Sequence, residues 1–126
     1  MPKITLKDGL SFEAEPSQRL VLALEDNGVD ILHRCGGHAR CTTCRVSSLD
    51  GEPTRMTRAE YERLTQRELL GQFRLSCQIL CDHDMKIEVI NRVSTSDLPD
   101  AGERPQEALT PEPEWMDATT TPPSQE

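Results

Sequence analysis

The chain has 126 residues, enough for one domain with a modest apolar core. Its formal net charge is −8, from 14 basic and 22 acidic residues, and a balance that acidic argues against nucleic acid as a partner. No run of about 18 apolar residues could span a bilayer, and the opening MPKITLKDGL lacks the apolar core of a secretion signal. We therefore expect a cytoplasmic protein without membrane insertion. Five cysteines in such a compartment favour metal or redox chemistry over a disulfide framework.

The first third of the chain predicts a β-hairpin followed by a helix. Residues 3–7 and 10–14 are short alternating runs on either side of Asp8-Gly9, a pair typical of tight turns. Ser17 is placed to cap a helix that ends near Asn27-Gly28, where a left-handed conformation is accessible. The apolar face of that helix consists of Leu20, Val21, Ala23 and Leu24. We expect this face to pack on the hairpin.

The remaining folded part predicts two more strands and a second helix. Residues 44–49, CRVSSL, read as a strand that ends at Asp50-Gly51. Thr57 and Glu60 have the spacing of a capping box, which opens an amphipathic helix reaching Leu70. An extended segment, FRLSCQIL, is expected at 73–80 and a last strand, KIEVI, at 86–90. This order of elements gives an α+β fold class.

Residues 94–126 are expected to form a tail separate from the domain at 1–93. The tail holds most of the excess negative charge and six of the nine prolines. Because it has few apolar residues to offset the entropy of ordering, we predict that it is mostly disordered. Trp115 and Met116 are its one apolar feature. They are either a chance exposed pair or a short docking motif that folds onto a partner.

Three of the cysteines lie within CGGHARCTTC at residues 35–44, and two more follow at Cys77 and Cys81. A structural zinc site draws its ligands as two close pairs, which would leave Cys35 and the Gly-Gly pair unexplained. A redox dithiol in CTTC would need a helix start, whereas a strand-like RVSSL follows. A 2Fe-2S cluster needs four thiolates and a loop that wraps closely around the sulfides, and Gly36 and Gly37 suit such a loop.

The motif CGGHARCTTC, with RLSCQ at residues 74–78, resembles the cluster-binding signature of 2Fe-2S ferredoxins. The gap of five residues after the first cysteine is similar to that of the adrenodoxin-like and bacterial branch. The resemblance covers residues 1–93 and implies a β-grasp fold, in which a helix packs on a mixed sheet beside a cluster-binding loop. It implies four ligands: Cys35 and Cys41 on the outer iron, which takes up the electron, and Cys44 and Cys77 on the inner iron.

Several other residues near the motif have an open role. Cys81 would be surplus, either a buried apolar thiol or a redox-sensitive or alternate ligand. The three histidines, His33, His38 and His83, are expected to be bystanders, because four cysteines already suffice. The nearby arginines are Arg34, Arg40 and Arg45. Our hypothesis is that they stabilise the reduced, more negative cluster and raise its potential.

The function expected from this reading is that of a one-electron carrier, not an enzyme. A single 2Fe-2S cluster would receive electrons from a ferredoxin reductase or other donor and pass them to an acceptor redox enzyme, and the carrier would be a monomer. The alternative is a redox-sensing module in which the cluster state controls partner binding by the tail or by the helix at 57–70. A third possibility, a zinc-stabilised interaction domain, predicts a colourless protein.

Overall fold

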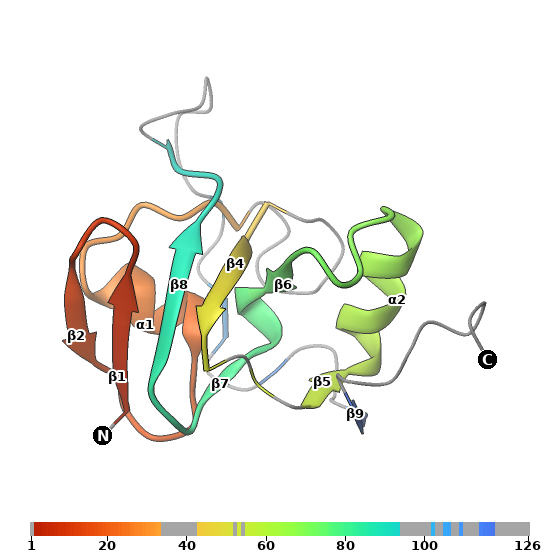
Figure 1. The fold of residues 1–126 in the computed structure, drawn as a ribbon, viewed down its shortest axis with the longest axis horizontal. Helices are drawn as coiled ribbons and strands as arrows, with labels where there is room; N and C mark the ends of the chain where they lie inside the picture. Colours follow the sequence, from red (N-terminus) through yellow and green to blue (C-terminus); the bar gives the residue numbers. More distant parts are fainter. Residues whose placement is uncertain are drawn as a thin grey trace.

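The computed structural model describes residues 2–33, 43–51, 53, 55–93, 102, 105–106, 109 and 114–117. Figure 1 shows the arrangement of the elements within these ranges. In chain order they are β1 (Lys3–Leu6), β2 (Ser11–Glu13), β3 (Gln18–Arg19), α1 (Leu20–Asp26), β4 (Arg45–Asp50), β5 (Arg55–Thr57), α2 (Arg58–Gln66), β6 (Arg74–Leu75), the 3-10 turn η1 (Ser76–Gln78), β7 (Leu80–Cys81), β8 (Met85–Val89) and β9 (Trp115–Asp117).

The main sheet has five strands in the order β2-β1-β8-β4-β6. Strand β8 is central: it runs parallel to β1 and antiparallel to β4, so the sheet is mixed. Helix α1 lies behind the sheet in Figure 1, and α2 lies beyond the β6 edge. Two short pairs, β3 with β7 and β5 with β9, complete the described strands. The mixed sheet with a packed helix confirms the predicted α+β, β-grasp fold.

The hairpin and the core follow the predicted pattern. Strand β1 pairs antiparallel with β2, and Ile4 stands opposite Phe12. The core lies between the sheet and α1, which contributes the fully or nearly fully buried residues Leu20, Val21, Leu22, Ala23 and Leu24. Each of the large side chains is worth about 1.5–3 kcal/mol when removed from water. The helix that joins the hairpin to the cysteine-rich stretch is thus fixed on the sheet by its apolar residues.

The start of α1 differs from the prediction. Ser17 does not cap the helix; it lies in a turn with φ +64°, and the N-cap is Arg19, which makes no side-chain capping bond. The reason is a long-range pairing, since Gln18 and Arg19 form β3 against Cys81 and Leu80 of β7. The helix can begin only after this pair of strand residues. Its end is as predicted, with Asn27 as C-cap and Gly28 at φ +84°.

The segment predicted to be extended at 73–80 is interrupted. It consists of β6, the turn η1 and β7, so Cys77 sits at the middle of a 3-10 turn between two strands. Helix α2 is also shorter than predicted and ends at Gln66 instead of Leu70. Strand β4 ends at Asp50, and Gly51 follows with φ +73°. A side chain at Gly51 would lie 2.5 Å from the Asp84 carbonyl oxygen, so this turn requires glycine.

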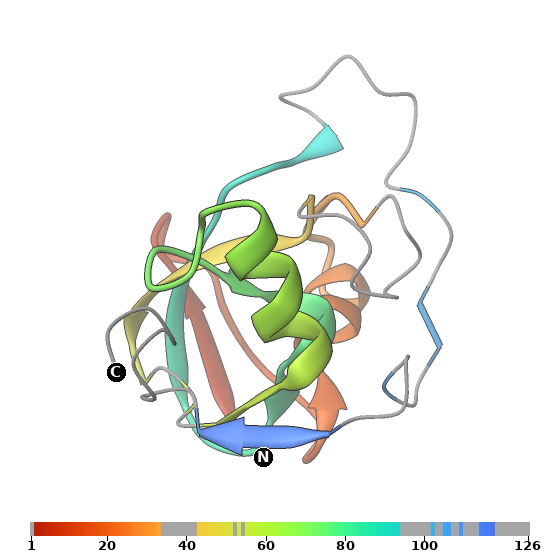
Figure 2. The same ribbon diagram turned by 90° about the vertical axis from the view of Figure 1, so that its right-hand side faces the viewer.

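One part of the tail forms a strand that the sequence did not indicate. Trp115–Asp117 pairs antiparallel with Arg55–Thr57, with Thr57 opposite Trp115 and Met56 opposite Met116. The backbone N–H of Arg58 donates to the Glu114 carbonyl at 2.7 Å and extends this pairing. In Figure 2 the strand β9 runs along the lower edge of the molecule, beneath the N-terminal end of α2. The separation of the chain into a domain at 1–93 and a mostly disordered tail stays a prediction for the other residues.

Candidate metal centre

Cys44 and Cys77, two of the four predicted ligands, are buried and lie on adjacent elements. Cys44 immediately precedes β4, and Cys77 lies in η1, directly after the β6 strand that pairs with β4. Ser76 joins the two segments, because its backbone N–H and its hydroxyl donate to the Cys44 carbonyl at 3.2 and 2.8 Å. The thiols are 1% and 0% exposed and neither forms a disulfide. The fold therefore gathers two thiols that are 33 positions apart in the printed sequence into one buried place.

The turn η1 also supplies a side-chain donor to one of these thiols. The Gln78 amide nitrogen donates to Cys77 Sγ at 3.6 Å. The Gln78 carbonyl oxygen accepts a hydrogen bond of 2.7 Å from the Thr57 hydroxyl. Thr57 in turn is the N-cap of α2 and accepts from the Glu60 N–H at 3.1 Å. The predicted helix cap is confirmed, and it belongs to a chain of hydrogen bonds that ends at a thiol.

A buried cation lies against the backbone of the same turn. Arg19 is fully buried, and its Nε and Nη2 donate to the Cys77 carbonyl at 2.9 and 2.7 Å. Its Nη1 donates to the Gln106 carbonyl at 2.8 Å. A guanidinium at this place favours added negative charge nearby, which suits a centre that gains an electron. The sequence reasoning missed this residue, because Arg19 and Cys77 are 58 positions apart.

The helix α2 is tied to the turn from its other side by a buried ion pair. Glu60 Oε2 accepts from Arg74 Nε at 2.7 Å and from the Leu75 N–H at 2.8 Å. Arg74 also donates to the carbonyls of Pro53 and Arg55 at 2.9 and 3.0 Å. The predicted capping box is therefore only half formed, since the Glu60 carboxylate serves Arg74 and Leu75 instead of returning to Thr57. The pair fixes the strand that leads into Cys77.

The remaining predicted ligands, Cys35 and Cys41, lie outside the described residues, together with His38, Arg34 and Arg40. Within the part that the structure describes, no three histidine, cysteine, aspartate or glutamate side chains gather as a metal site. The two described ligand candidates nevertheless fit an iron–sulfur group. They are buried thiols, one receives an N–H from Gln78, and the Arg19 guanidinium lies against the carbonyl of the same residue.

The sequence of residues 4–82 matches the family model described as "2Fe-2S iron-sulfur cluster binding domain". The chain belongs to this family. As a member it binds a 2Fe-2S cluster, which confirms the cofactor predicted from the cysteine motif and agrees with a ferredoxin of the bacterial type. The family and its ferredoxin neighbours also agree with an electron-transfer protein rather than an enzyme. The assignment of the four individual ligands stays a prediction.

Known proteins resemble this 2Fe-2S domain in sequence and in structure. A component of the Na(+)-translocating NADH-quinone reductase of Chlamydia felis is 35% identical over 92 residues, which are 71% of this chain and 21% of that protein. The chain thus spans about a fifth of the length of this relative. The ISC-like [2Fe-2S] ferredoxin FdxB of Pseudomonas putida superimposes with a TM-score of 0.61 at 27% identity, covering 71% of this chain and 93% of FdxB. Putidaredoxin, in a covalent complex with putidaredoxin reductase, superimposes with a TM-score of 0.53 at 28% identity. The match covers 71% of this chain and 99% of the putidaredoxin chain.

Arg45 is the one arginine of the hypothesis on cluster potential that lies within the described residues. Its Cζ lies 5.4 Å from the centre of the Phe73 ring, a cation–π distance. The Arg45 Nε is buried and has no hydrogen-bond partner among the residues that the structure describes. Among the arginines with described contacts, it is Arg19, which the sequence did not single out, that bonds to the backbone of a predicted ligand.

Cys81 is a buried thiol of the core, as one of the two predicted alternatives had it. It is fully buried in β7, and burial, together with the charge of Asp82, raises its pKa to about 12. At neutral pH the metal-free thiol is therefore protonated and a poor nucleophile.

We predict that Cys81→Ala keeps the iron and sulfide contents of the wild-type protein. The variant should lower the free energy of unfolding by about 0.5–1.5 kcal/mol, the range for removing one buried methyl-sized group. The measurement is iron and sulfide analysis together with urea unfolding. Loss of half or more of the iron from a variant that still folds would contradict this and make Cys81 a ligand.

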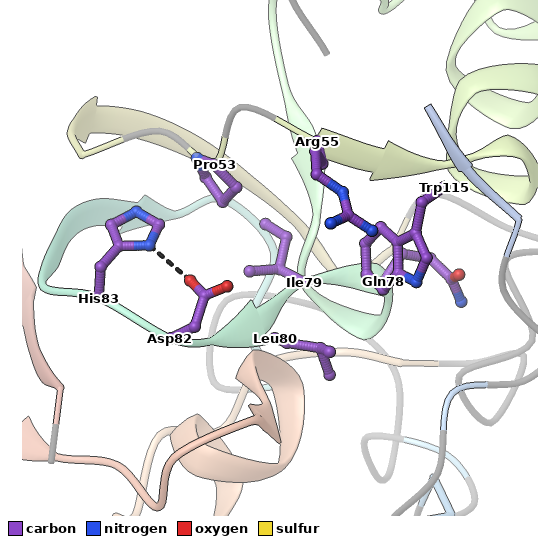
Figure 3. A pocket seen from close by; sticks show the side chains of 8 residues that line it. All are labelled: Pro53, Arg55, Gln78, Ile79, Leu80, Asp82, His83 and Trp115. Carbon is purple, nitrogen blue, oxygen red and sulfur yellow. Dashed lines mark hydrogen bonds and ion pairs between the residues drawn. The ribbon is translucent and has the colours of Figure 1, made fainter. Parts of the chain in front are cut away.

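The two described histidines have structural positions. His33 is fully buried, and its Nε2 lies 3.4 Å from Glu25 Oε1. His83 links the turn before β8 to the end of β4. Its Nδ1 lies 2.6 Å from Asp82 Oδ1, and its Nε2 lies 2.6 Å from the Gly51 carbonyl oxygen. Figure 3 shows the contact with Asp82. Burial acts to lower the pKa of His83, but the Gly51 carbonyl and the charges of Asp82 and Asp84 outweigh it and raise the pKa.

This raised pKa predicts a pH dependence of stability. A histidine whose pKa is higher in the folded state stabilises the fold most below the unfolded pKa of about 6.5, and this contribution is lost as the pH rises through the folded value. We expect His83→Ala to lower the thermal midpoint more at pH 5.5 to 6 than at pH 8.5. An effect of equal size at both pH values would show that the charge of His83 does not contribute.

Proposed function

We propose that the chain is a one-electron carrier in which Cys35, Cys41, Cys44 and Cys77 hold a single 2Fe-2S cluster. The observation that carries the proposal is the pairing of Cys44 and Cys77 through Ser76 at one buried place, with N–H and guanidinium groups directed at the Cys77 turn. The cluster supplies the redox chemistry when bound. The chain binds it, orients its ligands and offers hydrogen bonds and positive charge that favour the reduced state.

The chain's own residues are arranged for rigidity around this centre. The turn η1 is held on one side by Arg19, on a second by the Thr57 and Gln78 hydrogen bond, and before Cys77 by the Glu60 and Arg74 pair. A rigid surround lets an electron arrive and leave with little rearrangement of the protein. No bond-making group is needed for this role, because the protein contributes ligation, electrostatics and a docking surface.

We propose a ferredoxin reductase or other flavoprotein as donor and a redox enzyme as acceptor, with the carrier acting as a cytoplasmic monomer. Support for a reductase partner comes from putidaredoxin, which resembles this chain and was crystallised in a covalent complex with its reductase. Within the described residues no helix has the length and apolar character required to cross a membrane. The Chlamydia felis relative is part of a Na(+)-translocating NADH-quinone reductase, so a place beside a membrane complex is an outcome that the partner assay can reveal.

The test begins with protein purified without oxygen. We expect visible absorption that bleaches on reduction, with about two irons and two sulfides per chain. Reduction by NADH should then require a catalytic amount of a ferredoxin reductase, and the reduced protein should pass one electron to an acceptor such as cytochrome c. A colourless zinc protein would overturn the proposal. A cluster that exchanges electrons slowly, but changes the affinity of a partner with its oxidation state, would favour the redox-sensing alternative.

A further inference from the structure

We propose that Gln78 tunes the cluster through its hydrogen bond to Cys77 Sγ, and that the tail strand β9 controls this bond through Thr57. The inference rests on the proposed function, since it assigns a regulation to the same site. Gln78 and Thr57 are positioning residues in this scheme. The reactive centre is the cluster, which they reach only through the cysteine.

The orientation of the Gln78 amide is set by one hydroxyl. Thr57 Oγ1 donates its proton to the Gln78 carbonyl oxygen at 2.7 Å, and Thr57 Oγ1 itself accepts the Glu60 N–H at 3.1 Å. With its carbonyl end held in this way, the Gln78 side chain directs its NH₂ group at Cys77 Sγ, 3.6 Å away. Thr57, Cys77 and Gln78 are all 0% exposed, so water does not compete for these bonds.

The tail strand β9 pairs with the strand that contains Thr57, the residue that sets this orientation. Thr57 stands opposite Trp115 in the β5 and β9 ladder, and the bond from the Arg58 N–H to the Glu114 carbonyl continues the ladder into the first turn of α2. The Trp115 ring lies against Arg55, whose Cζ is 4.8 Å from its centre. In Figure 3 Arg55, Gln78 and Trp115 line one pocket of about 270 Å³, together with Ile79, Leu80, Asp82, His83 and Pro53. Strand β9 thus pairs beside Thr57, and its Trp115 lines the same pocket as Gln78.

The electrostatic consequence has a definite sign. Reduction adds a negative charge to the cluster and its sulfur ligands, and an N–H donor stabilises that charge. Loss of the Gln78 donor therefore lowers the reduction potential. If β9 holds Thr57 in place, its release loosens the same bond and lowers the potential in the same direction. A partner that displaces β9 would then make the carrier a stronger reductant when docked.

The test is the midpoint potential of the full-length holoprotein, measured by redox titration of its visible circular dichroism. Gln78→Leu removes the donor with little change in volume, and Thr57→Val removes the hydroxyl. Each is expected to weaken reduction about tenfold, which is about 59 mV for a one-electron couple. Thr57→Ser keeps the hydroxyl and should restore the wild-type potential.

The role of the tail is tested with a matched pair at Met116, the residue opposite Met56. Met116→Pro removes a backbone N–H from the ladder, and Met116→Ala keeps it. The proline variant should lower the potential, the alanine variant should not, and Met116→Pro should add no further shift to Gln78→Leu. The inference would be overturned if Met116→Pro had the wild-type midpoint potential, or if its shift added to that of Gln78→Leu in the double variant. It would also be overturned if Met116→Pro raised the potential by admitting water to the site.

The result separates this inference from the proposed function. If the wild-type chain carries a reducible cluster but Gln78→Leu and Met116→Pro leave its potential unchanged, the inference fails and the carrier function stands. If the wild-type chain holds no cluster, both fail. Should Thr57→Val not retain the cluster, the Gln78 and Met116 variants decide the question alone, because neither removes the cap of α2.

Discussion

Replacing Cys77 with serine is expected to abolish stable binding of the 2Fe-2S cluster, lowering the iron and sulfide contents from about two of each per chain to near zero. Serine fills nearly the same volume, so the 3-10 turn and its bonds to Arg19 can form as before. A serine hydroxyl does not ionise readily in a buried place, whereas a cysteine held beside a metal binds as the thiolate. The loss should therefore be a loss of ligation and not of packing.

The same result is expected for Cys44→Ser, and Cys81→Ala is the control. The measurement is the visible absorption of anaerobically purified protein with iron and sulfide assayed on the same sample. Because metal binding is coupled to folding, the unfolding midpoints of the two serine variants should match that of the wild-type apoprotein. Wild-type iron content and absorption in Cys77→Ser would contradict the assignment and point to another thiol, of which Cys81 is the next along the chain.

Local patterns predicted the parts of the fold that depend on neighbours in sequence. Asp8-Gly9 marked the turn of the β1 and β2 hairpin, and Thr57 was recognised as the cap of α2 from its spacing to Glu60. Each of these signals arises within four residues of chain, so sequence alone suffices to read it. The cysteine spacing, read with the motif it resembles, likewise indicated the cofactor.

Most of the errors and omissions involve partners far apart in sequence. Ser17 had the right residue type for a cap, but the β3 and β7 pairing, which joins Gln18 to Cys81, overrode it. Nothing in the local sequence marks Arg19 as special, yet it is fully buried and donates to the Cys77 carbonyl. Strand β9 needs an edge at β5 that no local pattern announces. Such contacts are decided by tertiary packing, which overrides local preference.

The buried ion pair of Glu60 and Arg74 is a further feature that the sequence did not predict, and it contributes to stability. Their side chains are 0% and 4% exposed, and the Arg74 Nε to Glu60 Oε2 distance is 2.7 Å. Glu60 also satisfies the buried N–H of Leu75. Removing one partner leaves a charge buried without its counter-ion, which costs about 3–5 kcal/mol, while an exposed pair is worth about 0–1 kcal/mol.

Glu60→Ala is therefore expected to lower the free energy of unfolding by about 3–5 kcal/mol. With a urea dependence of about 1–3 kcal/mol per molar, the midpoint should fall by about 1 M or more. The matched control is Glu62→Ala in the same helix, whose carboxylate meets Arg58 at 3.0 Å with both side chains more than half exposed. That variant should lose less than about 1 kcal/mol. Urea unfolding followed by far-ultraviolet circular dichroism compares the two, and equal midpoints would mean that the buried pair does not hold α2 to the strand that leads into Cys77.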